Sequence, residues 1–153
     1  MIISRFLALS VLAAATIALF PTAHADPATQ SVPSFALGQM WSIKSDVPTT
    51  ARVVIGRIEP FGSQTVVHVS IINVPIPNGV PGAGGQTQVG HMPFEQTALA
   101  NSVDQLLATN VAPVPGFQDG YAQWKSANGG IFTISVPKAI ELVFVSINKG
   151  SSQ

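Results

Sequence analysis

Alternation of apolar and polar residues predicts three β-strands in the first half of the chain. Residues 39–45 alternate as expected for a short strand with one buried face. Residues 50–59 and 64–73 are rich in β-branched residues, and the turn residues between them predict an antiparallel hairpin. Gly56 interrupts the second strand, where it is expected to mark a β-bulge or a close approach of another segment.

Helical spacing of apolar residues becomes prominent in the second half. It predicts a helix over residues 93–108, with one apolar face. Asp119 is placed to cap a short second helix over residues 120–127. Residues from 137 onward repeat at helical spacing, although residues 142–147 would also alternate as a strand.

Two further segments complete the expected order of elements. Residues 131–136 predict a fourth strand, and residues 74–90 predict a long irregular loop that is rich in proline and glycine. A loop of that length in a compact domain is either functional or disordered. Its glycines lack the Lys-Ser/Thr pair of a phosphate-binding loop. The order predicts an α+β fold, in which a small antiparallel sheet of three to four strands packs against two to three helices.

The N-terminal residues 1–25 have the layout of a secretory signal peptide. Arg5 supplies a positive charge, residues 7–20 form an apolar run, and small residues at 23 and 25 precede the expected cut. The apolar run is shorter than the roughly 20 residues that span a bilayer. We therefore expect export to a bacterial periplasm or secretion, with no membrane span after cleavage. The expected parts are a signal peptide at 1–25, a flexible lead-in at 26–34, a single α+β domain at 35–148 and a flexible tail at 149–153.

Composition narrows the classes of partner. The 153-residue chain has no cysteine, its seven basic residues balance its seven acidic ones, and only 9% of its residues are charged. An exported domain without disulfides depends on apolar burial for its stability. No basic stripe is present for nucleic acid or anionic lipid. We therefore expect no nucleic-acid partner, and a protein is the expected partner class.

Two histidines are the main polar candidates for a site. His68 lies in the middle of the predicted strand 64–73. It is expected to be a hydrogen-bonded interior residue if both sheet faces are covered, and solvated if one face is open. His91 precedes the predicted first helix, where it can satisfy free amides of the first turn. The alternative is that both histidines form one site with Glu59 or Tyr121.

The usual catalytic and metal-binding patterns are missing from the sequence. There is no Gly-x-Ser-x-Gly motif and no cysteine nucleophile. His68 and His91 are too few for the three or four protein ligands of a zinc site. Glu95 and Asp104 would lie on opposite sides of the predicted helix, so they would not act as an acid–base pair. The sequence predicts no catalytic set, no metal site and no cofactor, which makes an enzyme less expected than a binding protein.

Three large amphipathic rings are further candidates for binding. Tyr121 and Trp124 are three residues apart and share one face of the predicted helix. They are expected either to pack on the sheet near Trp41 or to form an exposed aromatic cluster beside Lys125. The second arrangement is suited to gripping a protein partner.

Five short sequence blocks together carry a resemblance to a known family. The blocks are LGQMW at 37–41, VHVSI at 67–71, HMPF at 91–94, GYAQWK at 120–125 and GIFTI at 130–134. In this order they resemble a family of small uncharacterised bacterial proteins, over roughly residues 35–147, which is nearly the whole expected mature domain. The resemblance implies no activity.

The leading hypothesis is an exported, non-enzymatic domain that binds another protein, such as an inhibitor or immunity-type protein of the cell envelope. The alternative is a small-molecule binding or hydrolytic domain using His68 and His91, which predicts that the two imidazoles line one pocket and lie within about 12 Å of each other. A third hypothesis is a structural envelope component that self-associates through a sheet edge.

Overall fold

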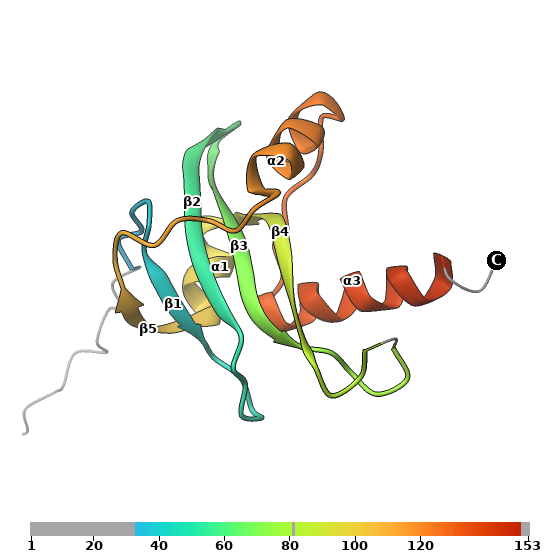
Figure 1. Ribbon diagram of the computed structural model, residues 1–153. Helices are drawn as coiled ribbons and strands as arrows, with labels where there is room; N and C mark the ends of the chain where they lie inside the picture. The colour runs from blue at the N-terminus through green and yellow to red at the C-terminus, as the bar shows by residue number, and fades with distance from the viewer. Residues whose placement is uncertain (1–32, 81, 151–153) are drawn as a thin grey trace, which may run out of the picture. The chain divides into compact units, whose positions relative to one another are not determined.

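The computed structural model describes residues 33–80 and 82–150. The expected signal peptide at 1–25 and most of the lead-in at 26–34 lie outside the described residues. The described chain forms a five-stranded antiparallel sheet with three helices (Figure 1), which confirms the predicted α+β class with one strand more than expected. The elements are β1 (Met40–Ile43), β2 (Arg52–Phe61), β3 (Gln64–Pro75), β4 (Gln86–Glu95), α1 (Gln96–Ser102), β5 (Val103–Ala108), α2 (Phe117–Ser126) and α3 (Val136–Gly150).

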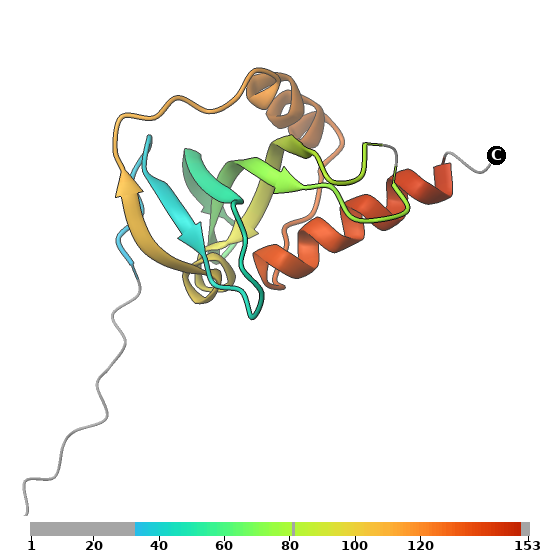
Figure 2. The same cartoon turned by 60° about the horizontal axis from the view of Figure 1, so that its bottom comes forward.

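Helices cover both faces of the sheet, whose strand order is β4-β3-β2-β1-β5. Figure 2 shows α2 on one side of the strands and α3 on the other. The main apolar core lies on the α3 side, where Leu99 of α1 and Phe144 of α3 pack against alternate residues of the central strands. Strand β3 is buried on both faces, because Val67 and Val69 join this core while His68 lies beneath α2.

The hairpin formed by β2 and β3 agrees with the sequence prediction. Its register shifts between Ile55 and Arg57, so Gly56 is the extra residue of a bulge. A Cβ atom at Gly56 would lie 2.3 Å from the ring of Phe117 in α2. Both parts of the expectation for Gly56 are confirmed.

The long loop predicted over residues 74–90 is wrong at both ends. Strand β3 continues to Pro75, and β4 begins at Gln86 and pairs with β3. The first residues of β4 are polar and exposed, so no apolar alternation marked them as a strand. Pro77 and the glycines at 79, 82, 84 and 85 lie in the connecting turn, which is closed by a hydrogen bond from the Ile76 N–H to the Gly85 carbonyl at 3.0 Å.

The helix predicted over residues 93–108 is also wrong, because only Gln96–Ser102 is helical. The residues before it belong to β4, and those after it form β5, which pairs with β1. The Glu95 carboxylate caps α1 by accepting a hydrogen bond from the Ala98 N–H at 2.8 Å. Pairing with neighbouring strands outweighed the helical spacing of the apolar residues at both ends.

The remaining elements bring two corrections and one resolved alternative. Residues 131–136 do not form a fourth strand, since Phe132 makes only an isolated bridge to Phe94 and α3 already begins at Val136. The short helix predicted over residues 120–127 begins earlier, at Phe117, and its N-cap is Gly116, which has a left-handed φ of 88°. The prediction that Asp119 caps this helix is wrong, because Asp119 lies within its first turn. Residues 142–147, which suited a helix or a strand, are part of α3.

Candidate functional site

The fold brings four of the five candidate residues together. His68 of β3 and His91 of β4 lie beneath Tyr121 and Trp124 of α2. Trp41 does not join them. Its ring packs edge-on against Phe35 at 5.7 Å, in the apolar core of the α3 side.

The two histidines are in direct contact. Nδ1 of His68 lies 2.8 Å from Nε2 of His91, and the two rings stack with their centroids 5.1 Å apart. His91 is a residue of β4, so its expected position at the start of a helix is wrong. A register shift between β3 and β4 lies next to His91 in the ladder. His68 is an interior histidine with 0% of its surface exposed, as expected for a sheet that is covered on both faces.

Glu59 of β2 extends the cluster on the other side of His68. Its Oε1 atom lies 3.3 Å from Nε2 of His68, although that nitrogen makes no well-aligned hydrogen bond to a described residue. The Tyr121 hydroxyl donates to the same carboxylate at 3.0 Å, and Nε of Arg57 donates to it at 2.8 Å. We assign the proton of His68 to Nε2, which faces the carboxylate, so that Nδ1 accepts from the Nε2–H of His91.

The electrostatics of the cluster keep the imidazoles neutral and the carboxylate charged. Burial, followed by the nearby His68, lowers the pKa of His91 to about 4. Burial also lowers the pKa of His68, and it outweighs the opposing effect of Glu59. Burial by itself raises the pKa of Glu59, but hydrogen bonds from Arg57 and Tyr121 reverse that effect, and the pKa lies below its usual value.

Helix α2 packs closely against this cluster. A Cβ atom at Gly120 would lie 2.7 Å from Cβ of His91, so the helix rests directly on the histidine. At the other end of α2, the indole Nε1–H of Trp124 donates to the Gly130 carbonyl at 2.8 Å. These two contacts hold α2, and the aromatic rings that it carries, against the sheet.

A hollow of about 350 Å³ lies beside the cluster, between the β2–β3 turn and α2. Figure 1 shows this turn close to α2. The ring of Phe61 is 37% exposed, and its centroid lies 5.8 Å from that of the partly exposed Trp124. The residues lining the hollow are Glu59, Pro60, Phe61, Trp124, Lys125, Asn128 and Gly129. Phe61 belongs to the turn predicted between residues 50–59 and 64–73, and no sequence pattern indicated that it would lie beside Trp124.

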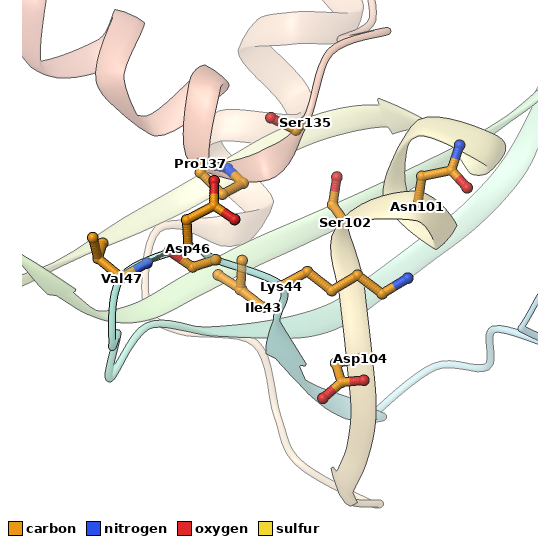
Figure 3. A pocket seen from close by; sticks show the side chains of 10 residues that line it. Ile43, Lys44, Asp46, Val47, Asn101, Ser102, Asp104, Ser135 and Pro137 are labelled. Atoms are coloured by element: carbon orange, nitrogen blue, oxygen red, sulfur yellow. Dashed lines mark hydrogen bonds between the residues drawn. The ribbon is translucent and has the colours of Figure 1, made fainter.

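Another hollow, of about 860 Å³, lies where the end of β1 meets β5 and the start of α3. Its polar groups come from several segments and do not converge: in Figure 3, Lys44, Asp46 and Asp104 extend in different directions. Its lining includes none of the five candidate binding residues, which are His68, His91, Trp41, Tyr121 and Trp124. We therefore place the candidate site at the smaller hollow, where aromatic rings and charged groups meet.

Neither a metal centre nor a membrane-spanning helix is found among the described residues. No three or more of their His, Asp or Glu side chains are grouped so as to hold a metal ion. None of the helices in the described part of the chain combines the length and the apolarity needed to cross a bilayer. No protein-family model, curated protein or solved structure matches the chain.

Proposed function

We propose that this protein is an exported, non-enzymatic domain of the bacterial periplasm or exterior that binds another protein, as an inhibitor or immunity-type protein does. The observation that carries the proposal is the hollow in which Phe61 and Trp124 present their rings beside Lys125. Aromatic side chains in a concave site are the usual anchors of a protein interface. The surface formed by the seven residues lining this hollow is called the aromatic hollow below.

The buried cluster supports this proposal by giving the aromatic hollow a rigid base. His68 has no exposed surface, and Tyr121 is only 9% exposed. Their contacts hold α2 and therefore Trp124 in place before a partner arrives, and such preorganisation lowers the entropic cost of binding. A general acid or base must lie within hydrogen-bond reach of its substrate, so a wholly buried His68 fits a supporting role better than a catalytic one.

The export part of the proposal rests on the sequence of residues 1–25, with their basic start, apolar run and small residues before the expected cut. Mass spectrometry of protein from the producing cell is expected to give a mature N-terminus at Asp26, in the periplasmic or secreted fraction. A cytosolic chain that retains Met1 would contradict export and leave the binding proposal to be tested separately.

Site-specific photocrosslinking tests the binding proposal. A benzophenone amino acid at position 61 is expected to form a discrete adduct with one protein of the envelope or secreted fraction. The matched control is the same photoprobe at Val145 of α3, which is 42% exposed and belongs to none of the residues lining the aromatic hollow. Trp124→Ala is expected to abolish the adduct. Equal labelling from both positions, or none from position 61, would contradict binding through the aromatic hollow.

The 2.8 Å contact between His68 and His91 favours one second candidate, a small-molecule binding or hydrolytic domain. His91 is the partly exposed member of the pair, so it is the imidazole that would meet a ligand. The test is hydrolysis of a panel of small esters and amides by the native protein and by His91→Ala. Turnover that disappears in the variant would support this candidate. Turnover equal to that of buffer alone would reject hydrolysis.

A further inference from the structure

We propose that the protein segment bound in the aromatic hollow carries a carboxylate next to an apolar side chain. This inference rests on the proposed function and specifies the chemistry of the partner. The aromatic hollow measures about 350 Å³, near the lower end of the roughly 300–1,000 Å³ typical of small-ligand sites. That size suits the side chains of a short peptide segment better than a broad protein face.

The charges around the aromatic hollow favour an anionic group. Arg57, Glu59 and Lys125 are the charged residues at this place, which gives a local excess of one positive charge. Arg57 is matched by the Glu59 carboxylate at 2.8 Å. Nζ of Lys125 lies 3.4 Å from the Tyr121 hydroxyl, and no carboxylate of a described residue forms an ion pair with it. Lys125 is thus an exposed cation with which a carboxylate of the partner can form an ion pair.

The apolar part of the aromatic hollow indicates which side chain accompanies the carboxylate in the bound segment. The Phe61 and Trp124 rings are tilted by 41° to each other, and Pro60 and Gly129 extend the same lining. An apolar or aromatic side chain inserted there buries ring surface, which stabilises the complex through the hydrophobic effect. Because Lys125 lines the same hollow as Trp124, an acidic residue adjacent to the inserted side chain can meet the ammonium group.

Peptide titration of the full folded chain tests this chemistry. The probes are Ac-Gly-Phe-Glu-Gly-NH2 and its neutral match Ac-Gly-Phe-Gln-Gly-NH2, and the readout is the indole N–H resonance of Trp124 in a nitrogen-15 correlation spectrum. The acidic peptide is expected to bind about two- to five-fold more tightly, as one surface ion pair provides. Equal affinities, or no shift with either peptide at millimolar concentration, would overturn the inference.

A charge reversal makes the test specific to one residue. Lys125→Glu is expected to reverse the preference, so that Ac-Gly-Phe-Lys-Gly-NH2 becomes the tighter ligand. Lys138→Glu is the matched control, since Lys138 is an exposed residue of α3 paired with Glu141 at 2.8 Å, and it should leave the preference unchanged. If both variants behave alike, the inference is wrong.

The two proposals fail in different ways. A crosslink from position 61 whose yield is insensitive to Lys125→Glu would overturn the carboxylate preference while the protein-binding function stands. Absence of any crosslink would contradict the protein-binding function itself.

Discussion

Acidification from about pH 7.5 to about pH 4.5 is expected to weaken the fold through the buried histidine pair. An imidazole in the unfolded chain has a pKa near 6.5. In the folded protein, burial and the neighbouring imidazole lower the pKa of His91 to about 4, and burial lowers the pKa of His68. Between these values the unfolded chain binds protons that the folded chain does not. Stability therefore falls as pH drops through 6.5, and the loss contributed by His91 is complete near pH 4.

The size of the effect follows from the pKa of His91. Each pKa unit corresponds to about 1.4 kcal/mol, so a pKa of about 4 in place of 6.5 corresponds to a loss of at most roughly 3.5 kcal/mol in the free energy of unfolding. His91 is partly exposed, and screening by solvent reduces the expected loss to about 1–3 kcal/mol. The pKa of Glu59 is lowered, so this carboxylate stabilises the fold above pH 4.5 and loses that contribution only at lower pH, outside the window.

Urea unfolding followed by circular dichroism at intervals of about half a pH unit measures this loss directly. The variant His91→Gln removes one titrating imidazole and is expected to flatten the dependence of the unfolding free energy on pH between about 6.5 and 4.5. Lower stability of the variant at neutral pH does not affect this comparison, because the slope is the readout. A variant with the native slope would refute the assignment of acid sensitivity to the pair.

Two further predictions concern close packing and a buried hydroxyl. Gly56→Ala places a Cβ atom 2.3 Å from the ring of Phe117 and is expected to cost about 1–3 kcal/mol in urea unfolding. Adding Phe117→Leu to Gly56→Ala should recover part of that loss. If the double variant instead loses the sum of what the two single variants lose in unfolding free energy, the contact is contradicted. Ser102→Ala removes the acceptor of the Val136 N–H at the start of α3 and is expected to cost about 1–3 kcal/mol. The exposed Ser146→Ala is its control, and equal effects of the two serine variants would count against the buried bond.

The parts of the fold that the sequence predicted correctly are those with a strong local signal. Strands β2 and β3 combine β-branched residues with a turn between them, and α3 repeats its apolar residues at helical spacing. Strand β4 was missed because its first half is polar and exposed, and its residues are ordered by pairing with β3. The helix over 93–108 failed for a related reason, since tertiary pairing decides the state of short apolar segments.

The contacts of the candidate site depend on the same non-local pairing. His68 and His91 are 23 residues apart, and their contact exists only because β4 lies beside β3. Tyr121 and Glu59 are separated by 62 residues and meet only when α2 lies across the sheet. Sequence spacing indicated that Tyr121 and Trp124 share a helix face, which the structure places over His68. It gave no means of placing Phe61 beside them.

The irregular pairing of β5 has a consequence for the behaviour of concentrated solutions. The ladder between β1 and β5 changes register on both sides of Trp41, at the end of a sheet where Leu106 and Leu107 are 46% and 43% exposed. A kinked outer strand is a poor template for another chain to extend. We therefore expect the irregular backbone of β5 to limit fibril growth in a protein whose few charges provide little mutual repulsion. Concentrated samples are expected to remain free of thioflavin-binding fibrils, and fibrils seeded through β5 would contradict this view.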